Sequence, residues 1–277
     1  EQLETMDEDD FLKRREEYKA ELPDGVLCLT CGVYTQDDRL EYEVVGYGME
    51  KHNWGIDKGI IYGKPSEDNV WERLDGIVDR KWKFENGKGI KISVTFVDSG
   101  GHYTQEVYEN CRKRRFKNVF AIKGRSEEGI PYISPPGKAK IVKKGVVIGT
   151  TPLFIIGVDA GKENIMSGLM MENENIHRYH FPLNEERGYD SNYFNGLLSE
   201  NKVFVETLRG GKWKWVKLPG HNRNEALDCR NYANAAYRAM NPNLEKLFQK
   251  IHEIKPKKKI PGTGRRKTSH RISNDDW

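Results

Sequence analysis

Hydrophobic and polar residues alternate along three stretches near the start of the chain. Residues 26–34 form an apolar run, residues 39–45 alternate leucine, tyrosine and valine with glutamate, and residues 56–62 are again rich in isoleucine. Such patterns predict β-strands with at least one buried face. Because the segments between them are too short for a crossover helix, we expect an antiparallel meander.

The apolar spacing then changes to that of a helix. After Ser66, valine, tryptophan, leucine and isoleucine recur at helical spacing until Asn86-Gly87 stops the pattern. A strand is expected over 90–97, a helix around 107–111 and a buried strand over 119–122. The predicted order to this point is three strands, a helix, a strand, a helix and a strand.

The second half of the chain is less regular. Residues 124–145 are rich in glycine, proline and lysine and predict an exposed excursion. A strand ending at Val158, a short helix from Lys162 and a hairpin over 203–218 are expected next, with the hairpin turning at Gly210-Gly211.

An alanine-rich segment over 222–240 predicts a closing helix whose small side chains let it lie close to a sheet. Three antiparallel strands, alternating helices and strands, and a closing helix are the element order of the ribonuclease H-like fold. We therefore predict an α/β protein with a central mixed β-sheet, antiparallel over its first three strands and parallel afterwards, flanked by helices.

Length and composition limit the organisation. The chain has 277 residues, 36% of them hydrophobic, which suits one sizeable domain. We expect this domain over 25–240, after a charged segment over 1–24 and before a basic, flexible tail over 241–277. No apolar run approaches the roughly 20 residues of a membrane span, so we expect a soluble intracellular protein. Four scattered cysteines suggest reduced thiols and no disulfide framework.

Candidate chemistry lies where strands end. In the predicted fold the fourth strand runs parallel to the first, so Tyr34 and Asp98 would lie side by side, and Asp228 on the closing helix adds an acid. Clustered carboxylates suit Mg²⁺ or Mn²⁺, and two such ions about 4 Å apart can drive phosphodiester cleavage. On pattern alone, however, an aspartate after a strand is more often a turn former or a helix cap.

Six sequence motifs carry a family resemblance over nearly the whole chain. They are GVYTQDDRLEYEVVGYG (32–48), VDSGGHYTQEVYE (97–109), AIKG (121–124), IGVDAGKENI (156–165), YHFP (179–182) and RNEALDCRNYANAA (223–236). In this order they resemble the nuclease domain of the large terminase subunit of lambda-like tailed bacteriophages.

The resemblance implies a metal-dependent endonuclease that cuts concatemeric double-stranded viral DNA in the bacterial host cytoplasm. It also implies an ATPase motor domain in the same full-length subunit, a small terminase subunit and the portal of the procapsid as partners, and no membrane. Metal binding, by Mg²⁺ or Mn²⁺ in a two-metal site, is carried over to Asp98 and Asp228. The chain has no GxxxxGK[ST] phosphate loop, so we expect a nuclease separated from its motor, with 1–24 as the remnant of the connection.

One position departs from the family pattern. The family has Gly-Val-Asp where this chain has Gly32-Val33-Tyr34, and a neutral phenol is a poor ligand for Mg²⁺. Asp37 and Asp38 are the nearest acids that could replace the missing ligand, but both match turn positions. The sequence therefore favours an impaired site over a rescued one.

Basic and aromatic residues supply candidate DNA contacts. Lysines and arginines flank the excursion, and Arg223 precedes the closing helix; the candidates are Lys123, Arg125, Lys138, Lys140, Lys143, Lys144 and Arg223. A solvated lysine-rich loop is the equal alternative. Trp213 and Trp215 alternate with lysines as DNA-stacking residues do, but their period of two favours packing on the core. The basic tail is either a contact to DNA or portal, or a disordered end.

Three functions remain. The leading hypothesis is a terminase-type DNA endonuclease whose metal site Tyr34 leaves incomplete. The second is a catalytically silent DNA-docking or motor-interaction module with the same fold. A ribonuclease or Holliday-junction resolvase is disfavoured, because the resemblance to terminases runs along the full chain.

Overall fold

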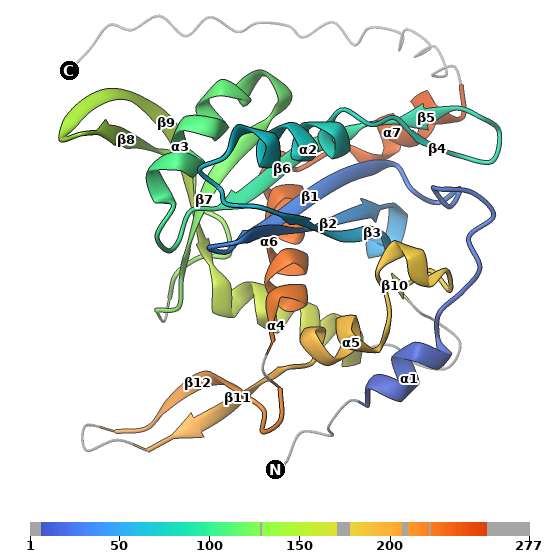
Figure 1. The fold of residues 1–277 in the computed structure, drawn as a ribbon. Coiled ribbons are helices and arrows are strands. Elements are labelled where there is room, and N and C mark those ends of the chain that lie inside the picture. Colours follow the sequence, from blue (N-terminus) through green and yellow to red (C-terminus); the bar gives the residue numbers. More distant parts are fainter. Residues whose placement is uncertain (1–6, 128, 171–177, 207–209, 222, 254–277) are drawn as a thin grey trace, which may run out of the picture.

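A computed structural model describes residues 7–127, 129–170, 178–206, 210–221 and 223–253 (Figure 1). Its centre is an eight-stranded sheet with the strand order β10-β3-β2-β1-β6-β7-β9-β8. The strands are β1 (Cys28–Thr35), β2 (Arg39–Tyr47), β3 (Asn53–Tyr62), β6 (Ile92–Asp98), β7 (Val119–Arg125), β8 (Gly137–Lys143), β9 (Val146–Gly157) and β10 (Tyr179–His180).

Strand directions confirm the predicted fold class. β1, β2 and β3 pair antiparallel, whereas β1 pairs parallel with β6, β6 with β7, and β7 with β9. This is the mixed sheet of a ribonuclease H-like fold. Val33 of β1 is in register with Val97 of β6, so the next residues, Tyr34 and Asp98, come at the same edge of the sheet.

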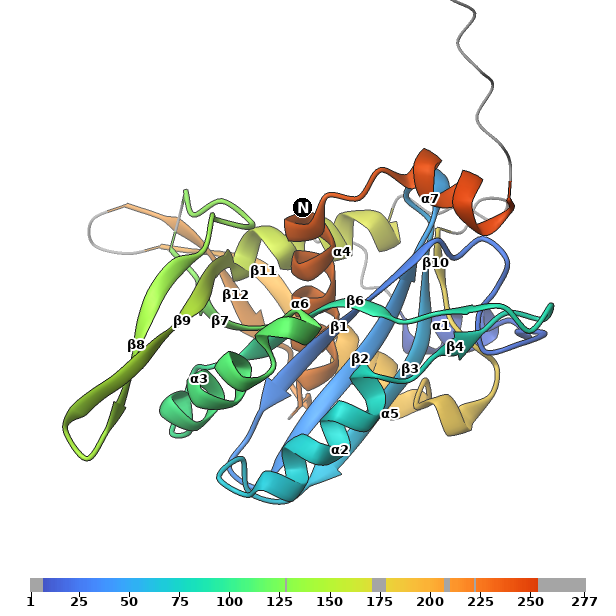
Figure 2. The ribbon, with the colours of Figure 1, turned by 90° about the horizontal axis from the view of Figure 1, so that it is seen from above.

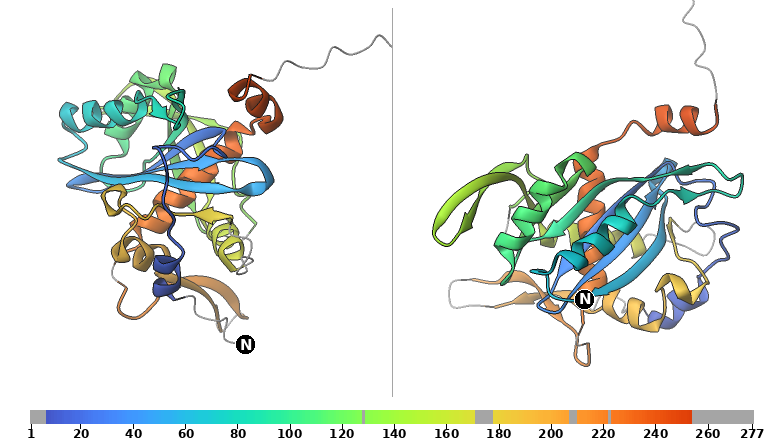
Figure 3. Two further views of the ribbon diagram at one scale, coloured as in Figure 1. Left: turned by 90° about the vertical axis from the view of Figure 1, so that its right-hand side faces the viewer. Right: turned by 45° about the horizontal axis from the view of Figure 1, so that its top comes forward.

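Helices cover both faces of the sheet (Figure 3). On one face α2 (Asp68–Val78) and α3 (Thr104–Lys113) bury apolar residues whose helical spacing predicted them, among them Trp71 and Val107. On the other face lie α4 (Val158–Met170), α5 (Ser191–Leu197) and α6 (Glu225–Met240). The predicted end of the first helix at Asn86-Gly87 is wrong, because α2 ends at Val78 and that pair lies in the turn between β4 (Trp82–Lys83) and β5 (Gly89–Ile90).

The approach of α6 to β1 depends on Gly32. A Cβ atom at this position would lie 2.1 Å from the carbonyl oxygen of Cys229 and 2.5 Å from the amide nitrogen of Ala233. No larger residue fits there without moving the helix. The Thr30 hydroxyl adds a hydrogen bond of 2.8 Å to the Ala233 carbonyl. This close contact sets the N-terminal half of α6 beside the carboxyl end of β1.

A buried ion pair joins the sheet to α6. Arg230 and Glu43 have fully buried side chains, and Arg230 Nε donates to Glu43 Oε1 at 3.0 Å. The hydroxyls of Tyr189 and Tyr193 donate to the same carboxylate oxygen at 3.1 and 2.9 Å. Arg230 also donates to Asn53 Oδ1 at 2.9 Å. These hydrogen bonds converge on Oε1 of Glu43, whereas the buried Oε2 of the same carboxylate has no hydrogen-bond partner in the structure.

Several elements differ from the sequence-based expectations. The excursion contains β8, which pairs antiparallel with β9, because its lysines alternate with smaller apolar residues and only one face is buried. α4 begins at Val158, directly after β9, so the expected start at Lys162 is wrong.

The remaining elements are short or peripheral. α6 ends at Met240, and α7 (Leu244–Ile251) is a separate helix within the segment expected to be a flexible tail, where helical signal fades in the sequence. Basic residues 254–277 lie outside the described residues. The other elements are α1 (Glu8–Lys13), β4 (Trp82–Lys83), β5 (Gly89–Ile90), β11 (Glu200–Val205), β12 (Lys212–Lys217), η1 (Met49–Lys51), η2 (Arg115–Lys117) and η3 (Glu185–Arg187).

The cysteines and the helix lengths agree with the sequence-based expectations. All four cysteines, Cys28, Cys31, Cys111 and Cys229, are buried free thiols, in keeping with the reading of reduced structural residues. Among the described residues, every helix is too short or too polar to cross a membrane.

Candidate metal centre

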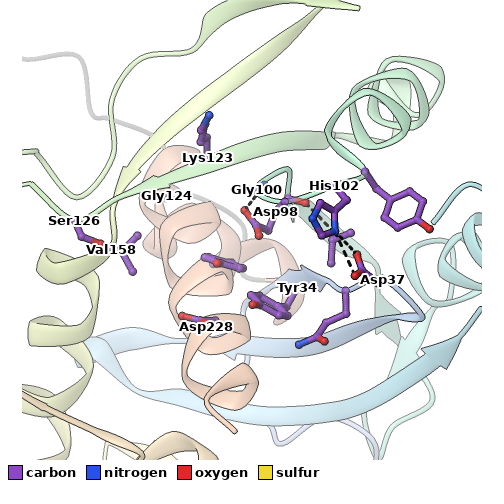
Figure 4. Close-up of a pocket in the computed structure, with 15 residues that line it drawn as sticks. Tyr34, Asp37, Asp98, Gly100, His102, Lys123, Gly124, Ser126, Val158 and Asp228 are labelled. Atoms are coloured by element: carbon purple, nitrogen blue, oxygen red, sulfur yellow. Dashed lines mark hydrogen bonds and ion pairs between the residues drawn. The ribbon is translucent and has the colours of Figure 1, made fainter. Parts of the chain in front are cut away.

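A pocket of about 510 Å³ opens at the carboxyl ends of β1 and β6 (Figure 4). The side chains of Tyr34, Asp98 and Asp228 all line it, as predicted for adjacent strand ends with a helix packed across them. The complete lining is Tyr34, Thr35, Gln36, Asp37, Asp98, Gly100, Gly101, His102, Tyr103, Lys123, Gly124, Ser126, Val158, Asp228 and Tyr232.

Asp98 is held at the end of β6 by its own turn. Its carboxylate accepts a hydrogen bond of 3.0 Å from the Gly100 amide, and its carbonyl accepts one of 2.8 Å from the Thr35 hydroxyl. Burial raises the pKa of Asp98 to about 6, although the amides of Gly100 and Ser99 and the charge of Lys123 act in the opposite direction. The turn therefore accounts for the position of Asp98 but leaves a carboxylate that is costly to ionise without a cation.

Asp228 lies in the first turn of α6. Burial raises its pKa to about 7; Lys162 opposes the shift, while Glu200, Asp98 and Glu225 add to it. The favourable charge at a helix N-terminus is thus outweighed by burial and by neighbouring acids. Two buried carboxyl groups whose charges repel each other, in one pocket, form an arrangement that a divalent cation would stabilise.

Three residues to which the sequence analysis gave no role form a hydrogen-bonded chain that ends at the Asp228 carboxylate. Lys162 Nζ lies 2.6 Å from Glu200 Oε2, and both side chains are buried. Asn224 Nδ2 donates to Glu200 Oε1 at 2.8 Å and to Asp228 Oδ2 at 3.2 Å. The sequence could not predict this chain of contacts, because Lys162 lies on α4, Glu200 begins β11 and Asn224 precedes α6. No spacing pattern in the sequence relates residues on three such separate elements.

Tyr34 lines the same pocket as Asp98 and Asp228. Its ring is half-buried and stacks on Tyr232, with ring centroids 6.4 Å apart. Burial and the nearby Asp228 and Asp98 raise the pKa of Tyr34 to about 12. The phenol is therefore neutral at physiological pH and adds no negative charge to the pocket.

The two neighbouring acids have different surroundings. Asp37 lines the pocket edge, and its carboxylate lies 3.0 Å from Nδ1 of the exposed His102. Asp38 lies outside the pocket lining, where its carboxylate pairs with Arg39 at 2.8 Å. Of the two, only Asp37 is placed near the metal candidates. Among the described residues, no three His, Cys, Asp or Glu side chains gather closely enough to hold a metal ion.

The basic candidates separate into three groups. Lys123 lines the pocket and is exposed. A second group is exposed on β7 and on the hairpin of β8 and β9: Arg125, Lys138, Lys140, Lys143 and Lys144. Arg223 instead pairs with Glu41 and, at 3.2 Å, with Glu225, although its side chain is 57% exposed. Of these basic candidates, Lys123 is therefore the best placed to contact a molecule bound in the pocket beside Asp98.

The raised carboxyl pKa values predict a pH-dependent stability. An aspartate whose pKa is higher in the folded than in the unfolded chain stabilises the fold as pH falls from 8 to 5. Asp228→Asn removes the ionisable group, so the variant is expected to unfold at higher urea concentration than the parent at pH 8, with the difference shrinking at pH 5. Urea unfolding in EDTA at both pH values measures this. An equal difference at both pH values would contradict it.

Comparison with known proteins addresses the family directly. The family model for the endonuclease domain of the terminase large subunit gpA matches residues 1–250. The chain belongs to this family. The resemblance inferred from the six sequence motifs is thereby confirmed.

Two curated relatives of this terminase family agree. The large terminase subunit of Escherichia phage lambda is 34% identical over 239 residues, covering 85% of this chain and 36% of the relative. The large terminase subunit of Enterobacteria phage P21 is 29% identical over 244 residues, covering 85% of this chain and 36% of the relative. The chain thus spans little more than a third of the length of either relative. A solved large terminase from a thermophilic bacteriophage aligns over 83% of this chain and 43% of its own, with 14% identity and a TM-score of 0.42.

Proposed function

We propose that this chain is a metal-dependent DNA endonuclease domain whose active site is impaired by Tyr34. The observation that carries the proposal is the meeting of Asp98 and Asp228 in one pocket of a terminase-family nuclease domain, both with pKa values raised by burial. Groups with strongly perturbed pKa values in a pocket are candidates for catalytic chemistry.

The residues of the pocket fit a hard divalent cation. Carboxylate oxygens are preferred ligands of Mg²⁺ and Mn²⁺, and neither Asp98 nor Asp228 has an ion-pair partner of its own among the described residues. Asp98 and Asp228 would hold the ion, and Tyr34 fills the place where the family has an additional aspartate. When bound, one or two such ions lower the pKa of an attacking water and stabilise the leaving oxygen in phosphodiester cleavage.

Other residues of the chain position the DNA. Lys123, exposed at the pocket, is suited to bind a phosphate next to the scissile bond. Arg125, Lys143 and Lys144 extend this positive surface along the neighbouring hairpin. Gly101 adopts a φ of +97°, a conformation that favours glycine, and the turn over Gly100 and Gly101 lets a backbone approach Asp98 without a side chain in the way.

The biological setting of the proposal follows the curated relatives. We propose that the chain acts on concatemeric double-stranded viral DNA in the host cytoplasm, together with an ATPase motor, a small terminase subunit and a portal. Residues 1–24 would connect the nuclease domain over 25–240 to the motor, and 241–277 would form a basic tail.

A plasmid-cleavage assay with Mn²⁺ tests this function. The chain is expected to nick or linearise plasmid slowly, with activity removed by EDTA and reduced to background by Asp98→Ala. Lys88→Ala, a change of an exposed lysine on the segment between β4 and β5, serves as the control and is expected to cleave as the parent does. Cleavage that persists in Asp98→Ala would contradict the assignment of the site.

A second candidate function rests on Tyr34 itself. Because the phenol brings no charge to the pocket, the chain would bind DNA without cutting it and serve as a docking module of the packaging machine. Detectable Mn²⁺-dependent cleavage that requires Asp98 would exclude this alternative, whereas DNA binding with no cleavage at any metal concentration would support it.

A further inference from the structure

The hairpin of β11 and β12 extends away from the body of the protein (Figure 1). Viewed from above, it points to the same side as the hairpin of β8 and β9 (Figure 2). The carboxyl ends of β1 and β6, where the pocket opens, face this side as well. Both hairpins therefore project on the side of the molecule to which these strand ends point.

The outer half of this hairpin exposes a pair of aromatic rings. Phe204 and Trp213 are cross-strand partners, and their side chains are 53% and 58% exposed. The rings meet edge to face with centroids 5.4 Å apart, and Lys202 Nζ lies 5.9 Å from the Trp213 ring. Trp215, two residues further along, instead packs against the buried cluster beneath α5.

The expected core position of Trp213 is therefore wrong. Its period of two with Trp215 does place both rings on one face of the strand, but the strand leaves the body of the protein between them. An exposed aromatic pair on a projecting hairpin has no packing role within the described part of the chain. Such a pair suggests contact with another molecule.

The same hairpin is rich in positive charge. Lys212, Lys214 and Lys217 are exposed along β12, and Lys202 lies on β11. Of the acids on the described part of the hairpin, Glu200 is buried against Lys162 and only Glu206 is exposed. Because neighbouring residues of a strand point to opposite faces, Lys212 and Lys214 lie on the face of the ribbon opposite the Trp213 ring. The hairpin thus has positive charge on one face and aromatic rings on the other, and both suit nucleic acid.

The base of the hairpin is attached to the candidate metal centre. β11 begins at Glu200, which accepts hydrogen bonds from Lys162 and from Asn224, and Asn224 in turn donates to Asp228. Lys202 also pairs with Glu163 on α4. Anything bound along the hairpin is thus held in a defined position relative to Asp228.

We infer that this hairpin is a DNA-docking arm that holds duplex flanking the scissile bond. The inference rests on the proposed nuclease function, and it adds a second surface to that of Lys123 and the hairpin of β8 and β9. Lys212 and Lys214 bind backbone phosphates, while Trp213 and Phe204 pack against sugars and base edges. A two-stranded ribbon fits the major groove of DNA, which is about 12 Å wide.

DNA is favoured over a protein partner by the charge of the surface. The exposed aromatic pair alone would suit either, but exposed lysines are depleted at the centre of protein interfaces and abundant where phosphates are bound. Lys202 lies on the same face as the ring pair, with its Nζ 5.9 Å from the Trp213 ring, so an apolar protein surface seated on the rings would have to exclude water from an ammonium group.

The test measures affinity for a fluorescent 30-base-pair duplex in EDTA, where no cleavage occurs, over a range of NaCl concentrations. Lys212→Gln/Lys214→Gln is expected to weaken binding and to lower the slope of log affinity against log salt by about 2. Trp213→Ala/Phe204→Ala is expected to weaken binding about fivefold or more at every salt concentration, with Trp213→Phe retaining most of the affinity. Lys81→Gln/Lys83→Gln removes the same charge beside β4, away from the hairpin, and should leave binding close to that of the parent.

The possible results distinguish a failure of the docking-arm inference from a failure of the nuclease proposal on which it rests. If the parent binds duplex and the hairpin variants bind as the Lys81/Lys83 control does, the docking arm is refuted while the nuclease proposal stands. If the parent does not bind duplex at any salt concentration, the nuclease proposal fails and the arm fails with it.

Discussion

Replacing Tyr34 by aspartate is expected to raise Mn²⁺-dependent plasmid cleavage by about 100-fold or more. The substitution exchanges a phenol, neutral because its pKa is raised to about 12, for a carboxylate beside Asp98 and Asp228. A third charged ligand supports binding of a second cation, and electrostatic stabilisation of this kind contributes factors of about 100 to 1,000 to rate. Initial rates of plasmid nicking at saturating Mn²⁺ measure the effect.

Two further variants distinguish the effect of the added negative charge in Tyr34→Asp from the effect of removing the bulky ring. Tyr34→Asn opens the same volume without adding charge and is expected to gain far less than Tyr34→Asp. Asp98→Ala in the Tyr34→Asp background should return cleavage to background. Loss of the ring contact with Tyr232 costs some stability, so thermal unfolding of each variant must accompany the rates. A parent chain that already cuts as fast as Tyr34→Asp would show that Asp37 supplies the missing charge.

Arg230→Met is expected to lower the free energy of unfolding by about 3 to 5 kcal/mol. The change leaves Glu43 fully buried without its cation, and the two tyrosine hydroxyls that donate to Glu43 cannot replace a charge. Asn53 loses its donor as well. Urea unfolding at pH 7 measures the change, because a midpoint shift at constant slope reports stability alone.

The matched control for Arg230→Met removes both charges. Arg230→Met/Glu43→Leu eliminates the uncompensated carboxylate, so it is expected to recover a large part of the loss, as apolar replacements of buried ion pairs do elsewhere. A single variant that loses less than about 1 kcal/mol would mean that Glu43 becomes protonated or hydrated at little cost. The ion pair between Arg230 and Glu43 would then not be what anchors α6 to the sheet.

Much of the framework was predictable because its signals are local. Alternating residues in β2, helical spacing in α2 and alanine in α6 each predict the right element, although β2 is in fact buried on both faces, including its glutamates. The order of elements then fixes which strand ends are adjacent. The placement of Asp98 and Asp228 in one pocket follows from that order.

The rest depends on contacts that no local pattern encodes. Lys162, Glu200 and Asn224 meet only after α4, β11 and α6 have packed together. Trp213 has the same alternation as a core strand, because a period of two reports which face a side chain is on and says nothing of whether that face is covered. Asp38 is an acid near the missing ligand in sequence, yet the direction of the turn takes it to Arg39 and away from the pocket.

Titration of the chain with Mn²⁺ by calorimetry at pH 8 is the most direct test of the proposed metal centre. We expect binding that Asp98→Asn and Asp228→Asn each weaken about tenfold or more, that Asp38→Asn leaves unchanged, and that Tyr34→Asp strengthens. These expectations concern binding alone and do not require that the chain cut DNA. Equal Mn²⁺ affinity in the parent, Asp98→Asn and Asp228→Asn would contradict the account, because the two buried carboxylates would then hold no metal.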